Sequence, residues 1–389
     1  MKILSVYINK KSKIFQTISL ILILSILSYF LVFSKTNYKI MSNIVDIFIS
    51  TVIPSLFSFI LFSNILIYSN YFNLIVNTRF SKIIQRFFKV SNYGSSAILF
   101  GFLFGYPNGA KYVNELYKTK KITFKEAEYL LLYINNSSPA FILSSVGIGM
   151  FGNIKIGALL LISHILASML VGKIFSKKYK LKYDKKFKSN NDTNSLNTSD
   201  YALTFEVITK AITKSIYTMC MIFGFMVTFI LSNNYISKIL SLLFSENKYI
   251  SSFMLCIMEI TSGLNKLIQL PFNLKNLIVL VSLFLGFSSL SIIFQIFSCV
   301  YKNNFKFKNI LKGKILHGIL SGIITYALLS IPHIYEYINI SKQVNYNYDL
   351  FKYSNIISSS IFILLTICST YLFTLVFLLK KKRLKNRFS

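Results

Sequence analysis

The segment Tyr133-Ile134-Asn135-Asn136-Ser137-Ser138-Pro139-Ala140-Phe141 places four consecutive polar side chains and a proline inside a long apolar run. Proline lacks a backbone donor and disfavours a helical residue before it, so a helix through this run must be interrupted. Backbone groups freed by an interruption cannot face lipid, and must be buried in protein or line a wet cavity. The segment therefore predicts a broken membrane helix over residues 123–151.

Three further interruptions accompany this one, and their order repeats. Each half of the chain has a long helix, a short amphipathic segment, a polar hairpin motif and an interrupted span. In the first half these are residues 44–69, residues 80–90, the motif Gly105-Tyr106-Pro107-Asn108-Gly109-Ala110-Lys111 and residues 123–151. In the second half they are residues 204–232, residues 236–244, the motif Glu259-Ile260-Thr261-Ser262-Gly263-Leu264-Asn265-Lys266 and a span interrupted near Gly286-Phe287-Ser288-Ser289.

The composition places these interruptions in a membrane protein. Hydrophobic residues make up 54% of the 389 residues and charged residues only 14%, whereas soluble domains carry about a quarter charged residues. Apolar runs such as 14–34 and 356–379 match the thickness of a bilayer at the helical rise per residue. Cys220, Cys256, Cys299 and Cys368 lie in apolar stretches without metal-ligand spacing, so they are interpreted as small hydrophobic residues.

We expect an all-α polytopic membrane protein with about eight transmembrane helices and two re-entrant hairpins. The expected crossings are residues 14–34, 44–69, 123–151, 154–176, 204–232, 274–300, 311–332 and 356–379. The expected hairpins are residues 93–118 and 250–272. The domains that follow are an N-terminal helix in 1–40, a first repeat in 41–176, a polar linker in 177–203, a second repeat in 204–300 and C-terminal helices with a basic tail in 301–389.

The net charge of +31 does not indicate nucleic-acid binding, because the basic residues lie between the apolar segments. Most of the lysines and arginines fall in segments that share one side if both termini are cytoplasmic. These segments are 1–13, 70–92, 111–126, 177–203, 301–314 and 380–389. Inside positive charge orients membrane proteins in this way. The first long helix and its counterpart then run in opposite directions, so the repeats are inverted, as in many secondary transporters.

The polar groups at the four interruptions are the candidate binding residues. Ends of broken helices expose backbone donors that suit anions and carbonyls that suit cations. The candidate substrate-binding residues are Asn108, Lys111, Asn135, Asn136, Ser137, Ser138, Thr261, Asn265, Ser288 and Gln295. Glu259 is a candidate for ion coupling or for an ion pair with Lys266, because an acid inside a membrane segment needs a partner.

Each candidate also has a structural interpretation. Lys111 can reach the interface as a snorkelling lysine. Asn135, Asn136, Ser137 and Ser138 can form hydrogen bonds between helices. The Glu259–Lys266 pair can be purely structural, and His164 is interpreted as a packed, hydrogen-bonded residue.

The quoted motifs resemble the YlbJ-type sporulation integral membrane proteins. The resemblance is carried by Val52 to Phe57, Gly105 to Lys111, Asn136 to Phe141, Gly147 to Asn153 and Glu259 to Lys266, and covers residues 40–330. It implies a nucleoside-recognition gate domain and an architecture similar to concentrative nucleoside transporters. It further implies carriage of dipicolinic acid across the outer forespore membrane during sporulation.

The expected function is therefore transport of a small organic anion, with dipicolinic acid as the substrate. A nucleoside carrier and a sporulation scaffold that transports nothing are the alternatives. No phosphate-binding loop, zinc spacing or nucleophile–base arrangement points to an enzyme. We expect no cofactor, with a proton or sodium ion left open as the coupling ion. The expected location is the cell membrane or the outer forespore membrane, and the similarity to nucleoside carriers leaves a homo-oligomer open.

Overall fold

The computed structural model describes residues 2–69, 71, 78–179, 203–243 and 247–339. The expected crossing at 356–379, the basic tail and nearly all of the linker 177–203 lie outside these residues. The chain divides into two units, residues 1–338 and residues 339–389. Within the described part of the first unit every regular element is a helix.

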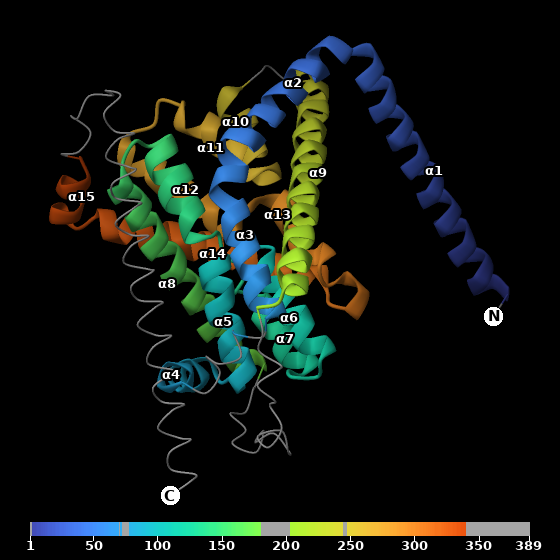
Figure 1. The fold of residues 1–389 in the computed structure, drawn as a ribbon. Coiled ribbons are helices and arrows are strands. Elements are labelled where there is room, and N and C mark those ends of the chain that lie inside the picture. Colours follow the sequence, from blue (N-terminus) through green and yellow to red (C-terminus); the bar gives the residue numbers. More distant parts are fainter. Residues whose placement is uncertain (1, 70, 72–77, 180–202, 244–246, 340–389) are drawn as a thin grey trace, which may run out of the picture. The chain divides into compact units, whose positions relative to one another are not determined.

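The first half of the chain forms ten successive helical segments in the described ranges (Figure 1). They are α1 (Lys2–Val32), α2 (Ser34–Ile47), the π-helical segment η1 (Phe48–Val52), α3 (Ile53–Tyr68), α4 (Arg79–Phe88), α5 (Asn92–Phe104), α6 (Asn108–Lys118), α7 (Phe124–Leu131), the π-helical segment η3 (Phe141–Met150) and α8 (Ile154–Tyr179). π-helical turns are rare and concentrate at functional sites. The two π-helical segments in the first half therefore mark candidate functional regions.

The second half begins with a long helix and continues with shorter ones. Its described elements are α9 (Phe205–Leu243), α10 (Lys248–Met258), α11 (Ile260–Ile268), α12 (Leu274–Phe287), α13 (Ser289–Ser298), the short 3₁₀ segment η5 (Tyr301–Asn303), α14 (Phe307–Leu329) and α15 (Pro332–Asn339). The expectation of a separate amphipathic segment at 236–244 is wrong, because α9 continues through it without a break. Periodicity alone does not distinguish the end of a long helix from a new short one.

Four described helical stretches are long and apolar enough to cross a membrane: Ser34–Tyr68, Ile154–Lys177, Phe205–Ile239 and Leu274–Ser298. The all-helical membrane class is thus confirmed. The count of eight crossings stays a prediction. The span expected at 123–151 is divided between α7 and η3, with a non-helical stretch around Asn135 between them.

Two pairs of short helices stand where the hairpins were expected. α5 packs on α6, and α10 packs on α11, each pair joined by a tight polar connection. Figure 1 shows α4 to α7 toward one end of this unit and α10 and α11 toward the other. Between the two hairpins, α3 and α9 lie side by side and run in opposite directions. Whether either hairpin is re-entrant in a bilayer stays a prediction.

Glycines permit the close crossing of α12 and α14. A methyl group built on Gly286 would lie 2.8 Å from the Gly318 Cα and 2.8 Å from the carbonyl oxygen of His317. Both neighbours are backbone atoms that cannot turn aside. The two helices are therefore held at a separation that only glycine allows, and the interruption after Phe287 is fixed against α14.

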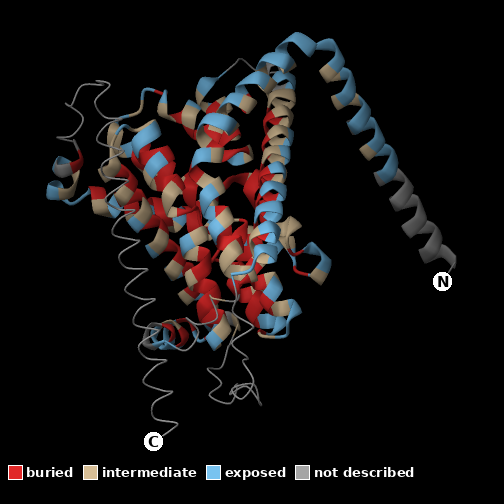
Figure 2. Ribbon diagram, in the orientation of Figure 1, coloured by how far each residue is buried: buried red, intermediate tan, exposed pale blue. Residues whose placement is uncertain are grey.

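Two helices, α8 and α14, carry polar side chains on their buried faces and apolar side chains on their exposed faces. On α14, Lys314, His317, Ser321 and Thr325 are fully buried, and their spacing of three or four residues puts them on one face. The opposite face carries Ile315, Ile319 and Ile323, which are 46–58% exposed. On α8, Ser163, His164 and Ser168 are buried while Ile162, Leu166 and Leu170 are exposed. Figure 2 shows the buried residues gathered on the inward helix sides. Exposed isoleucine and leucine stripes of this kind face lipid.

Candidate functional site

The interruption at Asn135 to Pro139 has its backbone groups satisfied by distant elements. The carbonyl oxygen of Asn136 accepts from the N–H of Tyr106, at 2.9 Å. The N–H of Ser137 donates to Nε2 of His164, at 3.1 Å. Free backbone groups inside a membrane segment require such partners. The first interruption is therefore buried within the protein and hydrogen-bonded to it. The tip of the α5–α6 hairpin is one of its hydrogen-bond partners.

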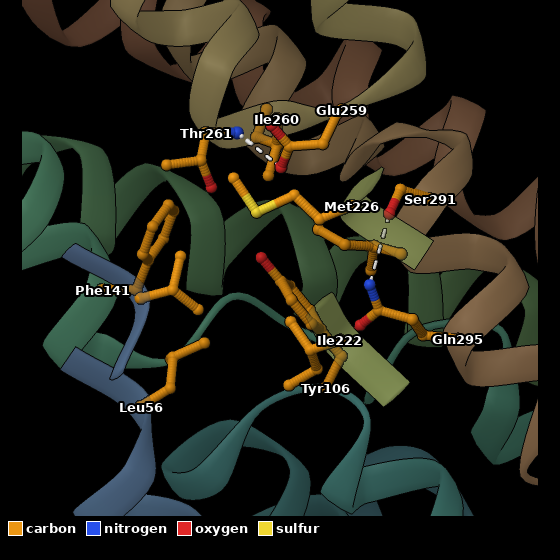
Figure 3. A pocket seen from close by; sticks show the side chains of 12 residues that line it. Leu56, Tyr106, Phe141, Ile222, Met226, Glu259, Ile260, Thr261, Ser291 and Gln295 are labelled. Atoms are coloured by element: carbon orange, nitrogen blue, oxygen red, sulfur yellow. Dashed lines mark hydrogen bonds between the residues drawn. The ribbon is translucent and has the colours of Figure 1, made fainter. Parts of the chain in front are cut away.

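Gly105 allows that hairpin tip to approach the interruption. Its φ is +66°, and a Cβ built on it would lie 2.7 Å from the Asn136 carbonyl oxygen and 2.8 Å from the Ser138 nitrogen. Only glycine fits this conformation and this distance. The following Tyr106–Pro107 peptide bond is cis. The connection directs the Tyr106 ring away from the hairpin and into the space between the two halves (Figure 3).

Glu259 forms the tip of the α10–α11 hairpin. Its backbone is extended between the two helices, and its carboxylate accepts from the N–H groups of Thr261, at 3.0 Å, and Ser262, at 2.7 Å. Glu259 is 5% exposed. An anion at a helix N-terminus is stabilised by the free N–H groups and the helix dipole. The carboxylate thus occupies the anion-binding end of α11.

The second interrupted span bends at Ser288 and Ser289. Both residues have a positive φ, 74° and 70°, which is uncommon for residues other than glycine. The Ser288 hydroxyl donates to the Leu285 carbonyl oxygen at 3.1 Å. The bend separates α12 from α13 at the position where the sequence placed it.

A small cavity lies where the four interrupted segments meet. It is lined by Val52, Leu56, Tyr106, Phe141, Ile222, Met226, Glu259, Ile260, Thr261, Ser291, Ile292 and Gln295, and has a volume of about 30 Å³. Figure 3 shows the Tyr106 hydroxyl on the side facing Thr261 and Glu259, with Ser291 and Gln295 beside them. Val52 ends η1 and Phe141 begins η3, so both π-helical segments contribute to its wall.

The polar groups around this cavity and behind it are only partly satisfied. Gln295 donates from Nε2 to the Ser291 hydroxyl at 3.3 Å, while its Oε1 has no partner among the described residues. Elsewhere among the described residues, Oδ1 of Asn135, Oδ1 of Asn136 and both side-chain atoms of Asn108 are buried without a partner, although none of these residues lines the cavity. Buried polar atoms are nearly always hydrogen-bonded to protein, water or ligand. The unpartnered polar atoms are therefore able to form hydrogen bonds with a bound polar ligand or with water.

A second polar cluster lies behind the first interruption. The Lys314 ammonium donates to the main-chain carbonyl of Asn135 and to the Ser288 hydroxyl, the latter at 3.0 Å. His317, one turn further along α14, contacts His164 on α8, with ring centroids 4.4 Å apart. Lys314, His164 and His317 are all fully buried. Through Lys314 this cluster joins the two interruptions.

The predicted residues are divided between these two places. Glu259, Thr261 and Gln295 line the cavity. Asn136 and Ser137 contact Tyr106, the latter through hydroxyl oxygens 3.5 Å apart. Asn135 and Ser288 bind Lys314. A role in substrate binding stays a prediction for all of them.

Other predicted residues lie away from the cavity. The Lys111 ammonium donates to the Thr218 hydroxyl on α9, and the Ser138 hydroxyl accepts from the Phe141 N–H at 3.2 Å. Asn265 is half-buried on α11. The expected Glu259–Lys266 pair does not form: Glu259 is buried at the start of α11, whereas Lys266 is exposed near its other end. The carboxylate finds backbone N–H groups instead of a cation.

Lys314 is the important residue that the sequence interpretation missed. The distribution of basic residues between the apolar segments predicts that it belongs to the cytoplasmic segment 301–314. The structure corrects this assignment. The polar stripe of Lys314, His317, Ser321 and Thr325 inside an apolar helix was the signal that could have found it. Among the described residues, no group of His, Cys, Asp and Glu side chains is arranged to hold a metal ion.

One curated protein is similar to this chain over most of its length. "Sporulation integral membrane protein YlbJ" of Bacillus subtilis (strain 168) is 25% identical over 301 residues, which span 71% of this chain and 74% of that protein. No family model and no solved structure matches the chain. The resemblance to the YlbJ-type sporulation integral membrane proteins is thereby confirmed, and the chain is an integral membrane protein. The nucleoside-recognition gate domain stays a prediction.

Proposed function

We propose that this chain is a secondary carrier of a small organic anion, with dipicolinate as its substrate, in a membrane of the sporulating cell. The observation that carries the proposal is the meeting of four interrupted helical segments at one partly polar cavity. Discontinuous helices that meet at a central site are how secondary transporters bind their substrates. The similarity to a sporulation membrane protein supports the cellular setting, and the family resemblance implies the substrate.

The size of the cavity indicates a closed arrangement. A volume of about 30 Å³ accommodates about two water molecules, and a pyridine ring with two carboxylates is several times larger. The hairpin tips at Tyr106 and Glu259 must therefore separate before such a substrate can enter. In the proposed cycle one hairpin moves while the other stays closed. Alternating access requires this property.

Glu259 has a defined place in the proposed cycle. Its carboxylate already occupies the N–H groups of Thr261 and Ser262, which are donors that a substrate carboxylate needs. Two carboxylates beside one another repel strongly in a buried site. In the proposed cycle the substrate carboxylate replaces that of Glu259 at these donors, and the displaced Glu259 takes up a proton. Glu259 then gives up this proton and returns to the helix end, which releases the substrate.

Uptake of labelled dipicolinate into proteoliposomes tests the proposal. The full-length protein, reconstituted with a pH gradient, should give saturable uptake that unlabelled dipicolinate competes away and an excess of uridine does not. Liposomes without protein supply the background. Competition by uridine would move the assignment to a nucleoside carrier. No uptake by correctly inserted protein, under either a proton or a sodium gradient, would leave a scaffold as the better interpretation.

A further inference from the structure

Lys314 is a buried lysine whose hydrogen-bond partners are neutral. Its side chain is fully buried, and its ammonium donates to the Asn135 carbonyl and the Ser288 hydroxyl. Asn135 begins the interruption of the first half, and Ser288 forms the interruption of the second half. One ammonium therefore links the two broken segments directly.

No carboxylate in the described part of the chain neutralises this ammonium. The titratable neighbours on the same face are His317 on α14 itself and His164 on α8. α12 beyond Lys275 and all of α13 contain no acidic or basic side chain. On α7, Glu126 accepts from the Ser91 N–H at 2.7 Å, and Glu128 accepts from the Asn309 amide at 2.8 Å. Both acids thus form hydrogen bonds with groups other than Lys314. The lysines Lys308 and Lys312 on α14 are exposed.

A fully buried ammonium without a carboxylate partner is costly, because its charge leaves water without being paired. Such a residue persists where the surrounding groups need a positive charge. A main-chain carbonyl at a helix break and a serine hydroxyl each offer a neutral oxygen atom. Oxygen atoms of this kind are the ligands that bind sodium or potassium at broken helices. The Lys314 ammonium occupies the position between them.

We propose that Lys314 is a resident cation, which holds the two interruptions together in the place where a transporter of this design would otherwise bind a metal ion. The chain then needs no sodium or potassium to form its closed arrangement. This statement concerns the fold and stands whether or not the chain carries an anion. Its consequence for transport, that uptake is independent of sodium, rests on the proposed function.

The test is thermal unfolding of the purified full-length protein in detergent, in chloride salts of equal ionic strength. Sodium, potassium and the large cation N-methylglucamine should give the wild type the same Tm. Lys314→Ala leaves two neutral oxygens without their donor, so its Tm in N-methylglucamine should fall by roughly 5 °C or more. Sodium or potassium should restore part of that loss by binding in the vacated place.

The matched control is Lys173→Ala on α8. Lys173 also donates to a main-chain carbonyl, that of Phe87 at 3.2 Å, but it does so at the exposed surface. Its removal should leave the Tm almost unchanged in all three salts. Lys314→Met keeps the length of the side chain without its charge, and it should lose stability but regain less with sodium, because its methyl group fills the space.

Three results would overturn the proposal. A wild-type Tm that rises with sodium would show that a metal ion binds in addition. A Lys314→Ala protein as stable as wild type would show that the ammonium holds nothing together. If Lys314→Ala does not accumulate, the effect of Ser288→Ala on the Tm is measured in the wild type and in Lys314→Met. Equal effects in the two backgrounds would show that Lys314 and Ser288 do not interact. None of these measurements depends on transport, so they stay informative if dipicolinate uptake is absent.

Discussion

The side chain of His317 donates from Nε2 to the main-chain carbonyl oxygen of His164, at 2.9 Å, while their rings lie 4.4 Å apart and are inclined by 50°. A carbonyl only accepts, so Nε2 of His317 carries the hydrogen. The Ser137 N–H in turn donates to Nε2 of His164, so neutral His164 carries its hydrogen on Nδ1. The two imidazoles therefore have opposite tautomers, and one of them supports the first interruption.

This arrangement predicts that His164→Ala is strongly destabilising. The substitution leaves the buried Ser137 N–H without a partner and opens a cavity beside His317. A lost buried partner costs about 1–3 kcal/mol, and the missing ring adds to that loss. The Tm of the purified protein should fall by several degrees. His333→Ala, at an exposed position on α15, should not change it, and equal Tm values for both variants would contradict the assigned role.

Glu259→Gln should separate binding from turnover. The neutral side chain still reaches the start of α11 but no longer repels a substrate carboxylate or takes up a proton. We expect uptake of dipicolinate to fall at least about tenfold, equivalent to about 1.4 kcal/mol in the barrier, while equilibrium binding does not weaken. The control is Glu206→Gln, an exposed acid in the first turn of α9. Uptake that survives in Glu259→Gln would remove Glu259 from the cycle.

Gly286→Ala should disturb the crossing of α12 and α14. The added methyl group would meet the backbone of Gly318 at 2.8 Å, and overpacking of this kind costs about 1–3 kcal/mol. Gly224→Ala is the matched control on α9, because a methyl group added at Gly224 would meet no atom within 4 Å. It should leave the Tm unchanged or raise it slightly, since alanine favours the helix. Thermal unfolding of the two variants measures the difference.

The expected orientation is open to a labelling experiment. Lys118, at the end of α6, and Gln269, at the end of α11, are both exposed and belong to the two hairpins at opposite ends of the unit. With the four native cysteines replaced, Lys118→Cys should react with an impermeant maleimide only in inverted vesicles. Gln269→Cys should react in intact cells. The reverse pattern would place both termini outside.

The positions of the interruptions could be predicted from the sequence because their causes are local. Pro139 and Gly105 each break a helix through their own backbone preferences or those of a neighbour, whereas Ser288 and Ser289 adopt positive φ angles that serine rarely takes. In the structure α5 ends at Phe104 and α6 begins at Asn108, and α12 ends at Phe287. The inside-out polarity of α8 and α14 follows equally from short-range spacing.

The partners of those interruptions could not be predicted in the same way. Lys314 is indistinguishable by sequence from an interfacial lysine until α14 is packed against α8 and α12. Glu259 and Lys266 are seven positions apart, so a continuous helix would place them on the same face, two turns apart. The helix begins only after Glu259, however, so the carboxylate turns back onto the first N–H groups. Contacts between distant elements decided both outcomes.

The bond between Lys314 and Asn135 also constrains how the protein is made. The two residues are 179 positions apart in the chain, and a ribosome adds roughly 5–20 residues per second. The carbonyl of Asn135 therefore emerges roughly 9–36 seconds before the ammonium that satisfies it. During that interval the first broken helix cannot be released into lipid without an unpaired polar group, so the insertion machinery must shelter it until α14 has been synthesised.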